Sequence, residues 1–185
     1  TDYSTGSAQL AWIESDLAFT TKPWKFVCLH EPGWSAGYHG NKTSVQNYIQ
    51  PLCETYGVSI LFAGHNHYYA RAVVNGVQHI TTGGAGAPLV SPDATYPNIV
   101  TATKTLHYCK VEMDGNLLTC TVVTPAGAVI DGFTLVNPST GVEPIVTGPR
   151  PKRPALNPAF PDPFNASTRV SFFLARSGKV SLRIY

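Results

Sequence analysis

The sequence predicts an α/β (α+β) layered sandwich, and two patterns carry this prediction. An apolar run at residues 24–29, a helix-spaced segment at 43–56 and a second apolar run at 58–63 follow one another. This is the order of a strand–helix–strand unit with parallel strands. Further along, shorter strand-like segments flank Asn-Gly and Asp-Gly dipeptides, which are typical of hairpins. The later half is therefore expected to be antiparallel.

Two helices are expected in the first half. Residues 7–17 place apolar side chains on one face, and Thr5 or Ser7 can cap the N-terminus. Apolar residues recur at i, i+3 and i+4 between 43 and 56, and Gly57 supplies a stop signal. Both helices are expected to cover the sheet.

The antiparallel half is expected to contain five strands, at residues 70–74, 77–82, 105–113, 117–124 and 128–136. The first pair of strands flanks Asn75-Gly76, and the second pair flanks Asp114-Gly115. Both dipeptides favour two-residue hairpin turns.

The chain has four cysteines. A two-residue turn at Asp114-Gly115 would place Cys109 opposite Cys120, close enough for a disulfide. That position is a hydrogen-bonded one, where the Cα atoms are farther apart than at the alternate positions. A disulfide and reduced core thiols therefore both remain open.

Three regions are expected along the chain. Residues 1–136 form the layered domain, and residues 137–160 form a proline-rich linker without periodicity. Residues 161–185 contain two strand-like runs, which cannot bury a core alone and are expected to begin a truncated β-sandwich. Because the first residues fall within a pattern and the last within a strand, the sequence is interpreted as a fragment.

The composition argues against several partners. The net charge is +2 and the basic residues are scattered, so no patch for nucleic acid is expected. No apolar run approaches the roughly 18 to 20 residues of a membrane span. Charged residues make up 13% of the chain, about half of ordinary usage, which is typical of extracellular proteins.

Three of the six histidines follow predicted strands. His30 ends the first strand, and Gly64-His65-Asn66-His67 follows the second. The carboxyl ends of parallel strands meet at the edge where α/β sheets place their ligands. Imidazole nitrogens at such an edge suit zinc, iron or manganese, so His30, His65 and His67 are predicted metal ligands.

Different roles are expected for the other three histidines. His39 lies in a glycine-containing loop nine residues after His30, where it can reach a substrate held at the metals. It is assigned a substrate-contact or acid role. His79 and His107 fall within predicted strands and are expected to be structural.

The ordered motifs resemble one family. These are residues 9–17 (QLAWIESDL), 29–32 (LHEP) and 64–71 (GHNHYYAR). Together they resemble the C-terminal half of calcineurin-like metallophosphoesterases, particularly the purple acid phosphatase branch. The resemblance covers roughly residues 5 to 136, and Ala70 stands where an acidic residue is usual. Residues 81–87 resemble the family's glycine-rich turn and are given no catalytic role.

This resemblance implies a dinuclear centre with two divalent or trivalent metal ions (Fe, Zn or Mn). His30 and His65 would bind the second metal, His67 the first, and His39 would contact the phosphate or protonate the leaving group. The aspartates, the asparagine, one catalytic histidine and the tyrosine of the family's first half are not in this sequence. The chain alone is therefore expected to be inactive.

Residues 157–168 and 177–185 resemble the C-terminal β-sandwich tails, of the sorting or hook-cap type, that exported bacterial proteins carry. This implies a secreted or cell-surface location.

The expected function is hydrolysis of phosphate monoesters, with a phosphate ester as substrate. The alternatives are a phosphodiesterase or nucleotidase of the same superfamily, and a surface-binding module without catalysis.

Overall fold

The computed structural model describes residues 2–137, 155–156 and 172–173. The chain divides into two compact units, Thr1–Ser139 and Thr140–Tyr185. In the second unit, β9 (Ala155–Leu156) pairs antiparallel with β10 (Phe172–Phe173). Apart from these short strands, the linker and sandwich tail expected from the sequence lie outside the described residues.

A five-stranded mixed sheet forms the centre of the first unit. Its strands are β1 (Phe26–Leu29), β2 (Ile60–Ala63), β3 (Tyr69–Val74), β4 (Val77–Thr82) and β5 (Ile99–Thr103). They lie in the order β1-β2-β4-β3-β5, with β1, β2 and β4 parallel and β3 antiparallel to both its neighbours. The strand–helix–strand unit and the Asn75-Gly76 hairpin are thus confirmed. Strand β5 was not expected from the sequence.

The helices begin and end close to the expected residues. Ser7 caps α1 (Ala8–Phe19), and its side-chain oxygen accepts a hydrogen bond from the Leu10 N–H at 3.2 Å. The second helix starts as the π-helix η1 (Val45–Ile49) and continues as α2 (Gln50–Tyr56). No helix within the described residues has the length and apolar character that a membrane crossing requires.

The π-helical start departs from the regular α-helix expected over 43–56. Pro51 lies in the first turn of α2. Proline has no N–H for a bond to the carbonyl four residues earlier, and its ring crowds that carbonyl. A wider turn before Pro51 relieves this crowding. The helix ends at Gly57, whose φ of 67° is left-handed.

A second, three-stranded antiparallel sheet contains β6 (Tyr108–Asp114), β7 (Leu117–Val123) and β8 (Val129–Val136). Asp114 pairs with Leu117, so the turn residues are Gly115 and Asn116 instead of the expected Asp114 and Gly115. Gly115 has a φ of 57°, the left-handed conformation that such a turn needs. The first part of the expected strand 105–113 lies outside β6, and the His107 N–H bonds instead to the Gly84 carbonyl at 3.1 Å.

This register changes the cysteine pairing. Cys109 lies opposite Val122, and Cys120 lies opposite Val111. The two cysteines are therefore offset by two residues, and the direct cross-strand pairing expected from the sequence is wrong. All four cysteines are free thiols.

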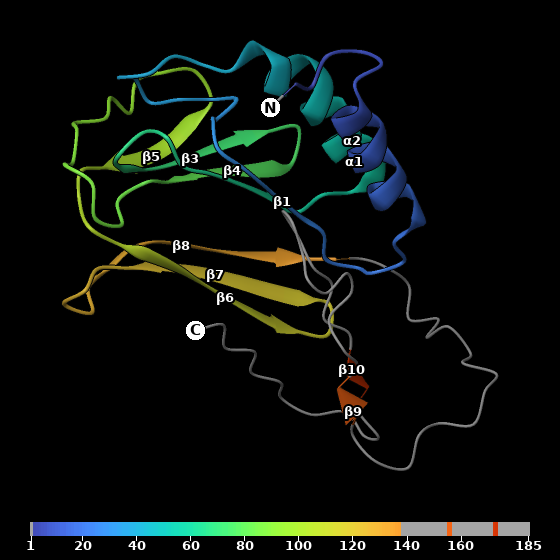
Figure 1. Ribbon diagram of the computed structural model, residues 1–185. Helices are drawn as coiled ribbons and strands as arrows, with labels where there is room; N and C mark the ends of the chain where they lie inside the picture. Colours follow the sequence, from blue (N-terminus) through green and yellow to red (C-terminus); the bar gives the residue numbers. More distant parts are fainter. Residues whose placement is uncertain (1, 138–154, 157–171, 174–185) are drawn as a thin grey trace. The chain divides into compact units, whose positions relative to one another are not determined.

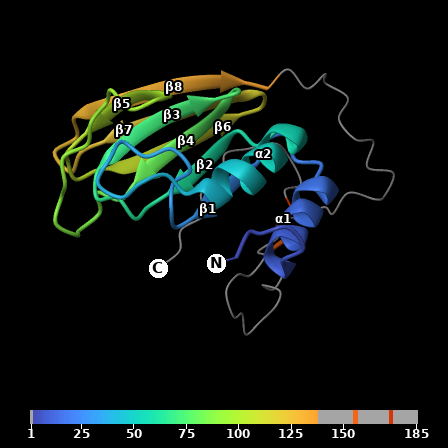
Figure 2. The same ribbon diagram turned by 90° about the horizontal axis from the view of Figure 1, so that it is seen from above.

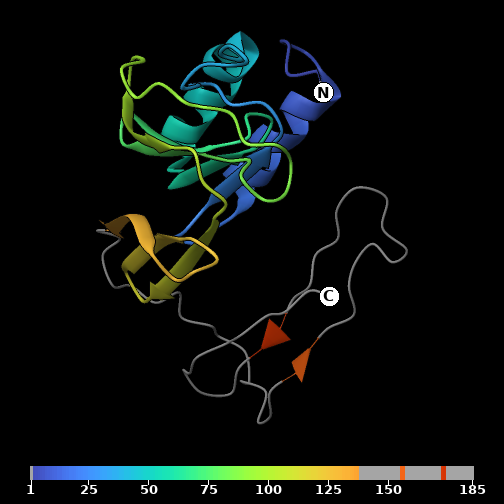
Figure 3. The same cartoon turned by 90° about the vertical axis from the view of Figure 1, so that its left-hand side faces the viewer.

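The first unit has three layers (Figures 1 and 3). The helices α1 and α2, seen together from above in Figure 2, cover one face of the mixed sheet. The buried residues of this layer are Ile13, Leu17, Val45, Ile49, Cys53, Val58, Leu61, Ala63 and Val77. On the other face, Ile60, Tyr69 and Ile80 pack against Leu118, Cys120 and Val122 of the second sheet.

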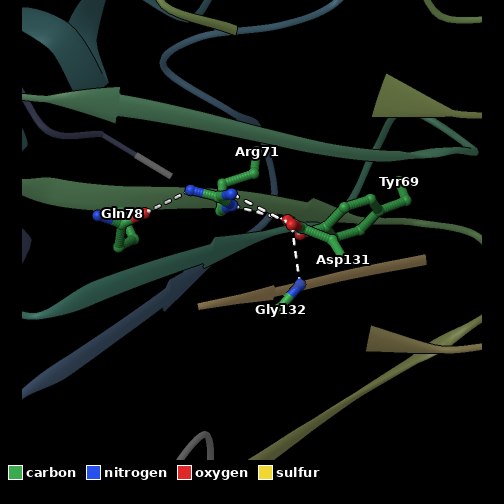
Figure 4. A network of polar contacts seen from close by, with 5 residues as sticks. All are labelled: Tyr69, Arg71, Gln78, Asp131 and Gly132. Atoms are coloured by element: carbon green, nitrogen blue, oxygen red, sulfur yellow. Dashed lines mark hydrogen bonds and ion pairs between the residues drawn. The ribbon is translucent and has the colours of Figure 1, made fainter. Parts of the chain in front are cut away.

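One polar network joins the two sheets (Figure 4). The Arg71 guanidinium donates to both carboxylate oxygens of Asp131, at 2.7 and 3.1 Å, and the Tyr69 hydroxyl donates to Asp131 at 2.6 Å. The Arg71 and Asp131 side chains are only 12% and 10% exposed. Burial raises the pKa of Asp131, but the bonds from Arg71 and Tyr69 outweigh it and lower the pKa below its usual value. The ionised carboxylate therefore ties β3 to β8.

Candidate metal centre

The carboxyl ends of β1 and β2 bring His30 and His65 together. The strands are in parallel register with Leu29 beside Ala63, so the next residues meet at one edge. The Gly64 N–H donates to the His30 carbonyl at 3.0 Å. His30 Nε2 lies 3.0 Å from His65 Nδ1, and the ring centroids are 4.9 Å apart.

This spacing fits a shared metal ion. Two imidazole nitrogens bound to one tetrahedral zinc-like ion at about 2.1 Å are themselves roughly 3.4 Å apart, close to the observed separation. In the structure the two nitrogens form a hydrogen bond, in which one ring donates and the other accepts. A cation can replace that proton without moving either side chain far.

The segment after β2 is bent, whereas an extended segment was expected there, in which His65 and His67 would point to the same side. The Asn66 N–H bonds to the Gly64 carbonyl at 2.7 Å, and the Tyr68 N–H bonds to the Asn66 carbonyl at 2.9 Å. His65 itself has a φ of 65°. A left-handed conformation is costly for a residue other than glycine and is often found at functional sites.

His67 faces a different loop. Its Nδ1 lies 3.0 Å from the Pro88 carbonyl, and its own carbonyl accepts a hydrogen bond from the Val90 N–H at 3.1 Å. A carbonyl can only accept, so Nδ1 carries the proton and Nε2 keeps its lone pair. Such a bond orients metal-binding imidazoles. Ring-to-ring contacts join His65 to His30 and to His39.

His39 also lies against His65. The two ring centroids are 4.3 Å apart, and the His39 side chain is exposed. Tyr38 packs edge-on against His39 at 4.5 Å and has a φ of 71°. The candidate acid His39 therefore lies beside the candidate ligand His65.

The neutral form of His65 is favoured. Partial burial is the largest cause that lowers its pKa, followed by the neighbouring His39 and His30 imidazoles, and Glu31 opposes the shift. A neutral imidazole offers the lone pair that a metal requires.

Acidic ligands are scarce near these histidines. Glu31 forms an ion pair with Lys42 at 2.7 Å, and the bond from Lys42 lowers the pKa of the carboxyl group. Within residues 2–137, no three His, Cys, Asp or Glu side chains are grouped to hold a metal ion. The described part of the chain thus offers nitrogen donors without a set of carboxylates around them.

The glycine-rich turn packs directly beneath the histidine segment. A Cβ atom at Gly83 would overlap the Asn66 carbonyl, and one at Gly84 would lie 2.6 Å from His107 Nδ1. Because both positions lack space for a side chain, this turn is a packed support for the centre.

His79 and His107 are buried and hydrogen-bonded away from the centre. His79 Nε2 lies 2.7 Å from Gln50 Oε1, and its ring packs against Trp34 at 4.6 Å. His107 Nε2 lies 3.0 Å from the Thr82 hydroxyl. Both therefore have the structural surroundings expected from the sequence.

The layered fold and its histidine edge are similar to those of one family of proteins. Residues 1–69 match the family model described as calcineurin-like phosphoesterase. The likeness to this family thus covers α1, the parallel strand–helix–strand unit and the histidine segment after β2.

Purple acid phosphatases are among its relatives. The chain is 32% identical to tartrate-resistant acid phosphatase type 5 of Homo sapiens, with 44% of this chain and 26% of that protein covered. It is 33% identical to purple acid phosphatase 18 of Arabidopsis thaliana, with 46% of this chain and 23% of that protein covered. The chain thus spans about a quarter of the length of these curated relatives.

Two solved structures share the fold. One is the purple acid phosphatase PPD1 of yellow lupin (Lupinus luteus), with a TM-score of 0.65, 23% identity and coverage of 73% of this chain and 29% of that one. The other is GAP50, described as the anchor in the inner membrane complex of Plasmodium. It has a TM-score of 0.63, 19% identity and coverage of 72% of this chain and 42% of that one.

Proposed function

We propose that the protein hydrolyses phosphate monoesters at a dinuclear metal centre, to which this chain contributes the histidine side. One observation carries the proposal: His30 Nε2 and His65 Nδ1 face each other at 3.0 Å, with the His39 ring beside them. Relatives named as acid phosphatases support the same reaction.

In this proposal His30 and His65 bind one ion, and His67 binds the other. The bond between His67 Nδ1 and the Pro88 carbonyl leaves Nε2 as the metal-binding atom. The oxygen ligands come from residues outside those described. When bound, the two ions neutralise charge on the phosphoryl group and lower the pKa of water.

His39 acts on the substrate in this proposal. Its exposed ring lies next to His65, so a phosphoester held at the centre is within its reach. A protonated imidazole donates a hydrogen bond to a phosphoryl oxygen, or gives its proton to the leaving oxygen as the P–O bond breaks. The leaving group then departs as a neutral alcohol.

The test uses the full-length protein loaded with zinc, iron or manganese, and compares a phosphate monoester with a diester. We expect higher kcat/KM for the monoester, and a loss of at least about 100-fold in His30→Ala and His65→Ala. The exposed-site variant Lys110→Ala should keep full activity. A preference for the diester would instead indicate a phosphodiesterase or nucleotidase.

A non-catalytic surface-binding module is the second candidate. The Plasmodium protein with this fold is described as an anchor, which shows that the fold is not confined to proteins named as phosphatases. Full-length protein that binds no metal and hydrolyses neither ester would favour this candidate over the enzyme.

We also propose that the protein is secreted or displayed on the cell surface. The proline-rich segment 137–160 would then link the catalytic domain to a sorting-type tail that starts near residue 161. Cell fractionation of the source organism tests this, and recovery of the full-length protein only from the cytosol would contradict it.

A further inference from the structure

Three buried polar side chains hold the loop that carries His39. Ser35 is 2% exposed, and Asn66 and Tyr68 are fully buried. All three bond to the loop around residues 35–41. A buried polar group is costly unless it is satisfied, so this network fixes a specific loop conformation.

Asn66 binds both backbone groups of His39. Its Oδ1 accepts a hydrogen bond from the His39 N–H at 3.0 Å, and its Nδ2 donates to the His39 carbonyl at 3.4 Å. The same Nδ2 donates to the Ser35 hydroxyl at 3.1 Å. An amide carries both a donor and an acceptor, which neither a carboxylate nor an alcohol of similar shape can present in the same places.

Ser35 and Tyr68 complete the network. The Ser35 hydroxyl lies 2.6 Å from the His39 carbonyl, and the Tyr68 hydroxyl accepts from the Ala36 N–H at 2.9 Å. Between them, Gly37 and Tyr38 both have positive φ angles, of 95° and 71°. A left-handed tyrosine persists only where the surroundings determine it strongly.

Asn66 also stands between the two candidate ligands of its segment, His65 and His67. Its backbone is fixed by the bend after β2 and by close packing against Gly83. One residue therefore links the candidate metal ligands to the candidate acid.

We propose that Asn66 is the positioning residue that sets the place of His39 relative to His65. This inference rests on the proposed phosphoesterase function. Asn66 does not touch the substrate. It acts by holding the His39 backbone, so its removal affects the step in which His39 gives a proton to the leaving oxygen.

Kinetics on the full-length, metal-loaded protein test this role. An alkyl phosphate needs a proton on its leaving oxygen, whereas nitrophenolate leaves without one. We expect Asn66→Ala to lower kcat by about 10- to 100-fold for the alkyl ester and less than about 3-fold for the nitrophenyl ester. The double variant with His39→Ala should be no slower than His39→Ala alone.

Gln78→Ala is the matched control, because Gln78 is also a buried amide but bonds to Arg71. This variant should leave the ratio of kcat for the alkyl ester to kcat for the nitrophenyl ester unchanged. Equal losses on both esters, or additive losses in the double variant, would overturn the role of Asn66. If Asn66→Ala does not fold, Asn66→Asp tests the same point, since it keeps the shape and loses the donor.

A second readout is independent of activity. In histidine-labelled full-length protein, NMR contacts between the His39 and His65 rings should be present in the wild type and in Gln78→Ala, and absent in Asn66→Ala. Retained contacts would overturn the inference. If the wild type hydrolyses no ester but shows this pattern, the proposed function fails while the positioning by Asn66 stands.

Discussion

Gly83 packs so closely against the Asn66 carbonyl that even a methyl group there would overlap backbone atoms. Backbone cannot move aside as a flexible side chain can, so the segment from His65 to His67 would have to shift. At the scale of single residues, the geometry of the centre thus depends on a glycine that bears no functional group.

We expect Gly83→Ala to lower the free energy of unfolding by about 1–3 kcal/mol, as overpacked positions generally do. Gly40→Ala is the control, because nothing lies within 4 Å of an added Cβ there and its φ is not left-handed. Chemical denaturation of both variants measures the difference. Equal stability of the two variants would contradict the close packing.

His79 makes the fold sensitive to acid. Burial lowers its pKa to about 4, although Glu54 opposes the shift. In the unfolded chain a histidine takes up a proton below about pH 6.5. The stability due to neutral His79 is therefore complete above pH 6.5 and is lost as the pH falls from there towards 4.

His79→Gln should remove this part of the acid sensitivity, because glutamine stays neutral and can still donate to Gln50. Urea unfolding at about pH 7.5 and 4.5 should show a loss of stability that is roughly 2–3 kcal/mol smaller in the variant. A loss of the same size in both proteins would rule out His79 as the group responsible.

At the scale of elements, the two sheets are tied by the Arg71–Asp131 pair as well as by apolar packing. Arg71→Ala would leave a buried carboxylate without its partner, so we expect a loss of about 3–5 kcal/mol. Lys110→Ala breaks an ion pair with Glu112 whose side chains are more than half exposed, and should cost less than about 1 kcal/mol. Thermal unfolding compares the two variants, and similar losses would refute the distinction.

Regular elements could be predicted from local patterns, and their irregularities could not. Apolar spacing located α1 and the strands on either side of the second helix to within a few residues. The π-helical start before Pro51 and the turn at Gly115-Asn116 depend on how several local preferences compete. Strand β5 is rich in β-branched residues, so the sequence did hold a local signal for it, but its place beside β3 depends on long-range pairing.

The proximity of His30 and His65 could also be predicted from local patterns in the sequence. His30 and His65 follow parallel neighbouring strands, so topology alone brings them together. The contacts of Asn66 with Ser35 and His39 span about 30 residues of chain and depend on loop conformation. Periodicity in the sequence does not reveal such contacts, so no role for Asn66 was predicted.

At the scale of the whole molecule, the chain spans about a quarter of its curated relatives. We expect residues 1–185 alone to bind zinc or manganese weakly and to show no turnover, because the described residues place no group of carboxylates around His30, His65 and His67. The full-length protein should retain two ions per chain through dialysis. Calorimetric titration and metal analysis compare the two, and tight binding of two ions by residues 1–185 would refute this expectation.

The left-handed φ of His65 lowers the stability of the fold, whereas its imidazole is required for the proposed metal binding. Glycine tolerates this conformation without the penalty of roughly 1–2 kcal/mol that a side chain brings. His65→Gly should therefore unfold at the same or a higher temperature than the wild type, while losing an imidazole that metal binding requires. Selection of a variant library for heat resistance alone should therefore enrich glycine at position 65. Directed evolution of this fold would have to select for catalytic activity in every round as well.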